Sequence, residues 1–446
     1  KKAVYALLYQ TDVQGQFFPI NDSQKGMSIQ SRELIAAVDI IYKYGGRDPE
    51  LLSVVAQQGQ VQLDDSGFKV AKDLAAGKVI PFKRPSIELR DGKDGTNGAL
   101  GILRSEKNNY EQTVAFKYTS HGLSHGHFDK LSYSLYDSFG EVIQDYGAAR
   151  WVNIDQKAGG RYLPETKTWA KQTIAHNTVT INEQSHFNGD IQISQDYHST
   201  PYFMDISNPE FQIASAKETK AYEGVEMQRT LLLLNDPLFE RPLFVDLFRV
   251  ESPKPVQMDL PLWFQGHLLE TSYDYDAQLD QMPTLGKSHG YQHVWKQAEG
   301  SSKASSAQLS WFSTNHFYTA TTATDATDKL IIGQLGANDP NFNLRPDQCF
   351  IVRKQDVKGT LFATVLESHG AYSPVDEIPL QPYGKIKTVT VLHNDTNYSA
   401  ITWQLASGES FFLAVANQDA SKEKEHKLTI GTTTYSWSGP YHLLKK

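Results

Sequence analysis

The chain has 446 residues and a formal net charge of −8, so it is long enough for more than one domain and is not basic overall. This charge argues against general nucleic-acid binding and against binding to anionic membranes, so an anionic ligand would need a local cluster of cationic side chains. The single cysteine, Cys349, excludes an intrachain disulfide, and no apolar run approaches the length of a transmembrane helix.

The first 80 residues or so predict helices. The opening residues KKAVYALLYQ contain neither an initiator methionine nor a signal peptide and indicate a helix already under way, so we expect further sequence upstream. An apolar stripe over residues 34–42 stops at Gly45, a second helix opens at Asp48 and ends at Gly59, and a third begins at Asp65 or Ser66. Short connections between them predict antiparallel helical hairpins, the unit of a bundle or toroid.

From about residue 86 the pattern changes to that of strands. Apolar and polar residues alternate in short runs separated by Gly, Asn, Asp and Pro, and residues 137–140 predict a hairpin turn. The Ser/Ala/Thr-rich stretches 296–308 and 320–329 predict exposed loops. The predicted strands include ALGILRS, TVAFKYTS, KLSYSLYDSFGEVIQDYG, HNTVTIN, RTLLLLN and LFVDLFRV, followed by residues 308–313, 349–353, 361–367, 385–393, 398–405 and 410–416.

These elements predict an α+β multidomain chain. We expect a helical domain over residues 1–85 and a large antiparallel β-sandwich over residues 86–446, with a small terminal sheet from about residue 380.

A dense polar cluster lies in residues 120–177. Three of its members, His127, Asp145 and His176, are two imidazoles and a carboxylate on separate segments, a ligand set that suits zinc with one position open or filled by water. Widely spaced His and Asp residues occur in most chains of this length, and histidines satisfied by backbone carbonyls are the commoner case. The spacing alone therefore raises a metal site as a hypothesis and leaves that alternative open.

Acid/base chemistry is a second hypothesis for the same cluster. His125 precedes His127 by two residues, so both face one side in an extended segment, whereas in a loop they can serve two neighbouring sites. Cations such as Arg150 would lower the pKa of the Tyr162 phenol toward a working value. The alternative for Tyr162 is an aromatic ring packed on a sheet edge with its hydroxyl in water.

Three further residues are candidates for contacts with a ligand. Trp151 and Trp169 flank the polar cluster and could stack on a sugar ring, although a core tryptophan is more common. Glu367 follows an apolar run and precedes a His-Gly turn, a position typical of a site residue at the end of a strand.

Several long blocks carry a family resemblance. HGHFDKLSYSLYD, IQDYGAARWVNI, GGRYLPETKTWAKQTIAHNTV and VLESHG resemble the heparinase II/III-like group of polysaccharide lyases, and most closely the alginate and oligoalginate lyases of polysaccharide lyase family 17. The similarity runs from FFPIND to beyond Glu367, and residues after about 380 are assigned by position alone. The resemblance implies the C-terminal part of an α/α-toroid followed by a large antiparallel β-sandwich, with the active cleft between them.

The resemblance also implies a reaction and a cofactor. The expected activity is an exolytic β-elimination that trims mannuronate-containing alginate oligosaccharides to unsaturated uronic acid monomers. By position, the zinc-binding triad of the family falls on His127, Asp145 and His176. In the family this zinc braces the sandwich beside the cleft, so its expected role is structural.

The remaining site residues are likewise carried over by position. His125 and Tyr162 match catalytic positions, Arg150 matches an arginine that contacts substrate, and Glu367 matches a residue that helps to close the end of the cleft. Elimination removes the C5 proton next to a carboxylate, which requires neutralisation of the charge that develops as an enolate-like species. In a syn elimination one tyrosine can serve as both base and acid, each role contributing on the order of 10² to 10⁴ in rate.

The chain departs from the family pattern at its beginning. The family's Asn-His pair, its principal catalytic tyrosine and about half of the toroid helices would lie upstream of Lys1, so we expect the 446 residues alone to be inactive. The resemblance implies a bacterial protein that is periplasmic, associated with the outer membrane or secreted. A homodimer is compatible with it, and neither nucleic acid nor a membrane span is expected.

Three alternatives remain open from the sequence. The first is a lyase of another uronate polysaccharide, such as a heparan-like polymer or glucuronan, although sulfated substrates call for more basic residues than an acidic chain offers. The second is a non-catalytic carbohydrate-binding sandwich, and the third, weaker, is a hydrolase with an open zinc site.

Overall fold

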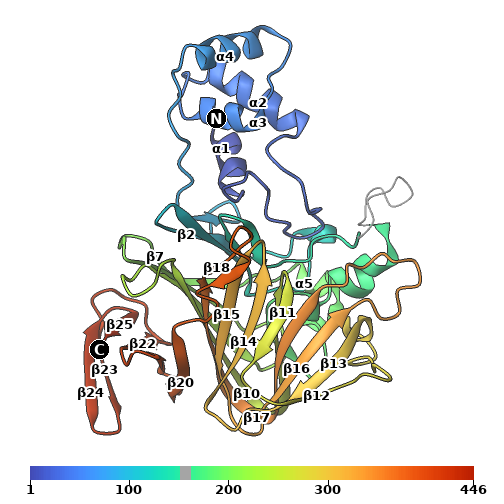
Figure 1. Cartoon of the computed structure of the whole chain (residues 1–446), viewed down its shortest axis with the longest axis vertical. Helices are drawn as coiled ribbons and strands as arrows, with labels where there is room; N and C mark the ends of the chain where they lie inside the picture. Colours follow the sequence, from blue (N-terminus) through green and yellow to red (C-terminus); the bar gives the residue numbers. More distant parts are fainter. Residues whose placement is uncertain (151–161) are drawn as a thin grey trace.

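The computed structural model describes residues 1–150 and 162–446. The N-terminal helices gather at one end of the molecule and the strands form its larger part (Figure 1). The four helices of the N-terminal part enclose a small core that includes Leu8, Val38, Leu51 and Val70. These helices are α1 (Lys2–Tyr9), α2 (Arg32–Tyr44), α3 (Leu51–Gln58) and α4 (Asp65–Ala75).

The ends of these helices follow their sequence signals closely. Ser31 caps α2 by accepting the Leu34 N–H at 3.4 Å, and α3 ends at Gly59 in the left-handed region with φ 73°. The start of α3 lies about one turn after the predicted cap at Asp48. Asp64 caps α4, one residue before the predicted start, because its carboxylate accepts N–H groups of the first turn. The toroid itself stays a prediction.

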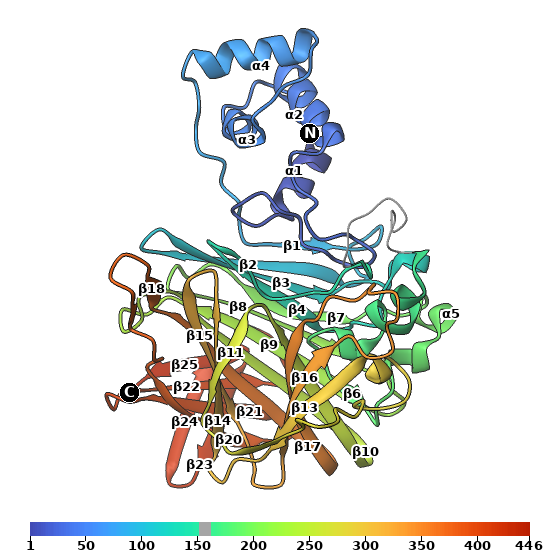
Figure 2. The same cartoon turned by 45° about the vertical axis from the view of Figure 1, so that its right-hand side comes forward.

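The layer of strands next to the helices consists of β1 (Ile87–Arg90), β2 (Ala99–Lys107), β3 (Tyr110–Tyr118), β4 (Ser132–Asp137) and β5 (Gly140–Ile143), paired antiparallel in that order (Figure 2). Asp137 pairs with Gly140 at the β4–β5 turn, so the predicted hairpin turn is confirmed.

Two strands of 22 residues, β10 (Leu243–Phe264) and β17 (Gln348–His369), pair antiparallel along most of their lengths. The prediction of separate short strands at 243–250, 349–353 and 361–367 is therefore wrong in extent. The register shifts between Glu251 and Val256, where Pro253 and Pro255 offer no backbone N–H to a ladder. This interruption of the alternating pattern marks a bulge in a continuous strand.

The other strands of the main sheet extend from these two. β9 pairs with the first half of β10, whereas β16 and β15 pair with the first and last parts of β17. These strands are β6 (Thr180–Ile181), β7 (Thr200–Asp205), β8 (Phe211–Glu218), β9 (Glu226–Leu234), β11 (His267–Thr271), β12 (Tyr275–Ala277), β13 (Val294–Gly300), β14 (Ser306–Ser313), β15 (His316–Ala323) and β16 (Lys329–Leu335).

The loop predictions at 296–308 and 320–329 are confirmed only in part: residues 301–305 and 324–328 lie between strands, whereas β13, β14, β15 and β16 occupy the rest of these stretches. Their inward positions carry small side chains such as Ala298, Ala307 and Ala320, which are all buried. Alanine next to Ser or Thr, as at Ala307 and Ala320, produces little contrast in hydrophobicity, so these runs do not show the alternating pattern of a strand.

The C-terminal residues form a separate four-stranded sheet in the order β20-β21-β22-β25. Trp403 and Phe411 of this sheet share a hydrophobic core with Leu232, Val245 and Val365 of the main sheet. The strands here are β18 (Ala371–Ser373), β19 (Ile378–Leu380), β20 (Ile386–Asn394), β21 (Tyr398–Leu405), β22 (Ser410–Ala416), β23 (Glu425–Ile430), β24 (Thr433–Ser438) and β25 (Tyr441–Lys445).

All strand pairs of these sheets in the described residues are antiparallel, so a mostly antiparallel β structure with few helices is confirmed. Within the same residues, no helix is long and apolar enough to cross a membrane. The short helices outside the N-terminal part are Leu123–His125, Thr166–Ala170, Thr173–Ala175, His186–Gly189, α5 (Ile191–Ser194) and Tyr291–His293.

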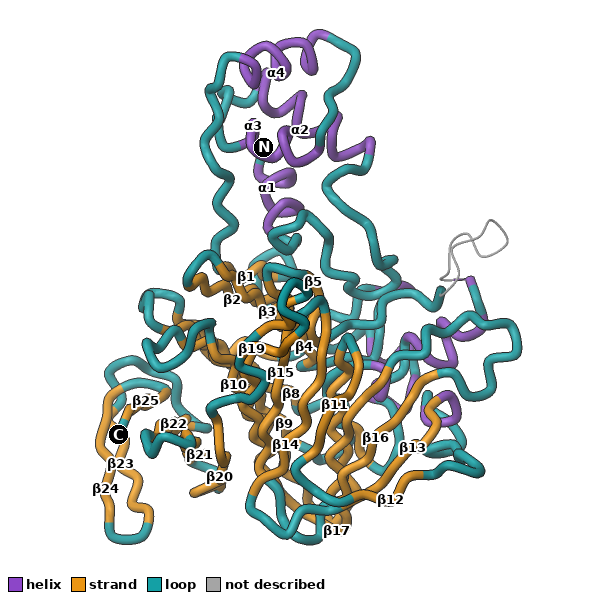
Figure 3. The backbone as a smooth tube through the Cα atoms, viewed as in Figure 1, coloured by secondary structure: helices purple, strands orange, loops and turns teal. Residues whose placement is uncertain are grey.

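One connection bears directly on the polar cluster. The loop of residues 10–31 between α1 and α2 runs from the helices to the strands and back (Figure 3). It meets the segment after β5, where the backbone N–H of Ala148 donates to the carbonyl of Ser23 at 2.9 Å.

Candidate functional site

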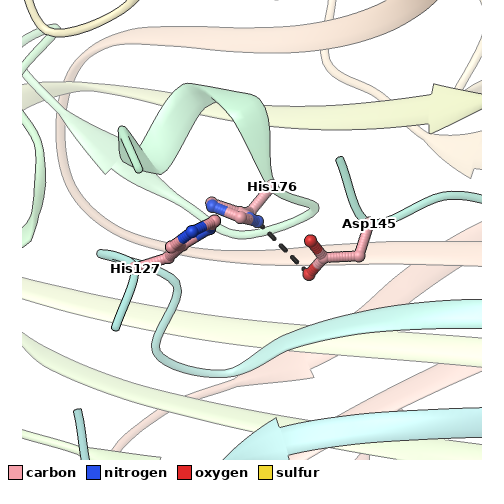
Figure 4. A group of neighbouring side chains, drawn as sticks. All are labelled: His127, Asp145 and His176. Carbon is pink, nitrogen blue, oxygen red and sulfur yellow. Dashed lines mark hydrogen bonds and ion pairs between the residues drawn. The ribbon is translucent and has the colours of Figure 1, made fainter. Parts of the chain in front are cut away.

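His127, Asp145 and His176 come together in the structure. One ligand atom from each residue lies within 4.8 Å of the others, and all three residues are buried (Figure 4). The Nδ1 atom of His176 lies 3.3 Å from Oδ2 of Asp145, and the two imidazole rings are 5.2 Å apart between centroids. Three segments supply this group: the loop after the helix Leu123–His125, the segment after β5, and the residue after the helix Thr173–Ala175.

The donor atoms of this group fit a metal ion. Nδ1 of His127 and Nε2 of His176 are buried and have no hydrogen-bond partner among the described residues, an arrangement that costs free energy unless a ligand satisfies it. Burial lowers the pKa of His127 to about 4, which keeps its lone pair available. Burial alone would raise the pKa of Asp145, but the neighbouring His176 lowers it, so the carboxylate is ionised. Two imidazoles and a carboxylate suit zinc among the common ions.

Asp22 links this group to His125. Its Oδ1 atom lies 3.1 Å from Nε2 of His127, and its Oδ2 atom lies 2.9 Å from Nδ1 of His125 and 3.5 Å from Nζ of Lys171. Burial alone would raise the pKa of Asp22, but His127, His125 and Lys171 lower it overall. Sequence reasoning missed Asp22, because it lies 103 residues before His125 and no spacing signal reaches that far. Its only trace was the block FFPIND, at which the family resemblance begins.

Neighbours of Asp22 on the same loop also contact the polar cluster. Asn21 accepts a hydrogen bond from Lys117, which in turn pairs with the buried Asp129. Gln24 accepts a hydrogen bond from Nη1 of Arg150 at 2.9 Å. The structure thus brings Arg150 and His125 to the same loop, and the side chain of His125 is 55% exposed.

The remaining candidates have different surroundings. Tyr162 is 76% exposed and directly follows residues 151–161, so Trp151 lies outside the described residues. Trp169 is fully buried against Tyr146 and Trp263, with ring centroids 5.8 and 5.2 Å away. Because its faces are covered, the prediction that Trp169 stacks on a sugar ring is wrong, and the core alternative is confirmed.

Glu367 lies near the end of β17, two residues before His369, which lines the same cavity. Its Oε2 atom accepts the backbone N–H groups of Lys385 at 2.6 Å and Ile386 at 3.2 Å, and burial raises its pKa to about 7. It lines a cavity of about 350 Å³ together with Tyr383 and Lys385. No hydrogen bond or ion pair between described residues joins Glu367 to His125.

Residues 88–404 match the family described as heparinase II/III-like, C-terminal, and the chain belongs to this family. It is 39% identical over 441 residues to an exo-oligoalginate lyase of Saccharophagus degradans, covering 98% of this chain and 59% of that protein. It is 38% identical over 440 residues to an alginate lyase of Stenotrophomonas maltophilia, covering 99% of this chain and 59% of that protein. The chain thus spans about three fifths of the length of these relatives.

A solved structure of a heparinase III resembles the chain with a TM-score of 0.57 and 12% sequence identity, covering 93% of this chain and 54% of that one. At this low identity the likeness concerns the fold alone. It agrees with an antiparallel β architecture for the described strands.

Proposed function

We propose that the chain is the sandwich-bearing part of a polysaccharide lyase that cleaves mannuronate-containing alginate oligosaccharides by β-elimination. The observation that carries this proposal is the placement of an exposed imidazole, His125, beside the buried His127, Asp145 and His176 group on one loop system. The identity of 38 to 39% with two curated alginate lyases over almost the whole chain supports the substrate class.

The proposed roles follow from the charges that the reaction develops. Because the Nδ1 atom of His125 faces Asp22, its Nε2 atom is the one available to a substrate proton. The guanidinium of Arg150 would neutralise the substrate carboxylate while the C5 proton leaves. The exposed phenol of Tyr162 would exchange a proton with C5 or with the departing O4.

The metal group has a structural role in this proposal. His127, Asp145 and His176 would hold zinc, whose charge would stabilise their buried lone pairs and fix the three segments that carry them. Every acid/base step is assigned to His125 and Tyr162.

Other parts of the proposal rest on the family resemblance. We propose that Glu367 helps to close one end of the substrate cleft, that α1 to α4 belong to an α/α-toroid, and that release of unsaturated monomers proceeds from a chain end. The bacterial compartment would be the periplasm, the outer membrane or the medium, and a homodimer is compatible with the resemblance.

The test is the ultraviolet absorbance of the conjugated unsaturated uronate on mixing the full-length protein with mannuronate oligomers. His125→Ala and Tyr162→Phe are each expected to lower kcat/KM by about 10² or more, the range of one acid/base role. His267→Ala and Tyr275→Phe, both exposed residues on β11 and β12, serve as matched controls and should keep the wild-type rate. Wild-type absorbance that does not rise on these oligomers would refute the proposal.

The same assay separates the alternatives. Absorbance that rises only with a heparan-like polymer or glucuronan would favour a lyase of another uronate. Binding of oligomers without any product would favour a carbohydrate-binding sandwich.

A further inference from the structure

A single carboxylate joins two histidines to which we assign different roles. Asp22 places Oδ1 at 3.1 Å from Nε2 of His127 and Oδ2 at 2.9 Å from Nδ1 of His125. His127 is fully buried, whereas the side chain of His125 is 55% exposed. Asp22 comes from the loop between α1 and α2, so a residue of the helical part organises both histidines of the sandwich.

The chemistry of a carboxylate restricts how these rings are protonated. An ionised carboxylate only accepts hydrogen bonds, and a neutral imidazole carries its proton on one nitrogen. His127 therefore carries its proton on Nε2, and its Nδ1 atom, which is buried without a partner among the described residues, keeps its lone pair. His125 carries its proton on Nδ1, which leaves the lone pair of Nε2 for a ligand.

The charge of Asp22 is itself compensated. Nζ of Lys171 lies 3.5 Å from Oδ2 of Asp22 and also donates to the carbonyl of Ser124 at 2.5 Å. Ser124 lies in the short helix that ends at His125. Lys171 thus places a positive charge beside the Asp22 carboxylate and fixes both Asp22 and the turn that carries His125.

We propose that Asp22 is a positioning residue that holds His127 ready to bind the metal ion and His125 ready to accept a proton, so that the metal group and the reacting imidazole are coupled through one side chain. The part of this inference that concerns His125 rests on the proposed lyase function. The part that concerns His127 rests on metal binding by His127, Asp145 and His176 and is independent of the reaction.

Asp22→Asn tests the coupling with almost no change of shape. The amide has one accepting and one donating end, so it cannot accept from both rings, and one ring must change its tautomer. We expect zinc affinity, measured by competition with a chromogenic chelator, to fall by about 10-fold to 100-fold, as for other hydrogen-bond partners of metal ligands. Asp22→Glu keeps the carboxylate and should recover most of the affinity.

Asp395→Asn is the matched control. Asp395 also pairs with a histidine, because its Oδ2 atom lies 3.0 Å from Nε2 of His393, but this pair lies at the end of β20 and the turn that follows it. Its substitution should change neither zinc affinity nor kcat. With mannuronate oligomers, Asp22→Asn should lower kcat with little change in KM, since His125 would act on the reacting proton rather than bind the sugar.

Nuclear magnetic resonance of the full-length protein with isotope-labelled histidines tests the tautomers without any dependence on folding of a variant. We expect the ring proton of His125 on Nδ1 and that of His127 on Nε2. This role of Asp22 is overturned by the opposite tautomers, by a wild-type protein that does not bind zinc, or by wild-type zinc affinity in a folded Asp22→Asn protein. Failure of the lyase assay alone would overturn the proposed function. The zinc affinities and the tautomers would still decide whether Asp22 positions His127.

Discussion

Arg229 shows how single residues hold the segments around the histidines. It is 1% exposed, and its Nε and Nη2 atoms donate to the two carboxylate oxygens of Asp246 at 2.8 and 2.5 Å. Its Nη1 atom donates to the carbonyls of Leu131 and Asn177.

Asn177 follows the metal-group residue His176, and its side chain donates to the carbonyls of Tyr133 and Gln144 at 2.9 and 2.8 Å. Arg229, Asp246 and Asn177 thus form a buried hydrogen-bonded support next to the metal group.

Arg229→Met is expected to lower the free energy of unfolding by about 3 to 5 kcal/mol, because it leaves the buried Asp246 carboxylate without its partner. Urea denaturation followed by circular dichroism measures this loss. The control is Arg90→Met, which breaks an ion pair with Glu88 in which the arginine side chain is 56% exposed and should cost at most about 1 kcal/mol. Equal losses for the two variants would contradict this view of the support.

Among single residues, the types of side chain that can bind a metal could be predicted from the sequence. Their hydrogen-bond partners from distant segments could not. The ligands His127, Asp145 and His176 were chosen by their donor atoms, and the structure places them together. Asp22 could not be chosen, because folding alone brings it to His125 and His127.

At the scale of elements, helices and strands were predicted correctly where apolar residues recur with a strong helical or strand period. The helical stripe and its terminal Gly45 predicted α2, and the stop at Gly59 predicted the end of α3. The prediction failed where small residues face inward, as in β13 and β15, and where a bulge with two prolines interrupts β10. Periodicity reports contrast in hydrophobicity, whereas strand pairing also depends on neighbours far away in the chain.

Glu367, near the end of β17, should make the stability of the folded protein depend on pH. Burial raises the pKa of Glu367 from 4.5 to about 7, so the folded protein holds this proton at pH values where the unfolded chain has lost it. Stability from this group is full below about pH 4.5 and falls as the pH rises through 7, by on the order of 3 kcal/mol.

Glu367→Gln should remove this contribution, since an amide oxygen can still accept the N–H groups of Lys385 and Ile386. We expect the difference in unfolding free energy between about pH 5 and pH 8 to shrink relative to wild type, in denaturation curves measured at both values. Glu423→Gln, at an exposed position, is the control. An unchanged difference in the Glu367→Gln protein would contradict the assignment.

At the scale of the whole molecule, the loop of residues 10–31 ties the helices to the sandwich. Besides Asp22, it contributes Lys25, which pairs with Glu141 and donates to Gln144 at 2.6 Å. The helices therefore do more than precede the sandwich, since their connection completes the surroundings of His125 and Arg150.

The central claim is that the reaction is an elimination, and mass spectrometry of all products from a mannuronate oligomer of defined length tests it most directly. An elimination breaks the bond to O4 without adding water, so the product masses should add up to the mass of the oligomer, and one product of each cleavage should be lighter by one water than the corresponding saturated sugar. Products that are all saturated, with one water added for each bond broken, would mean hydrolysis and would contradict this claim.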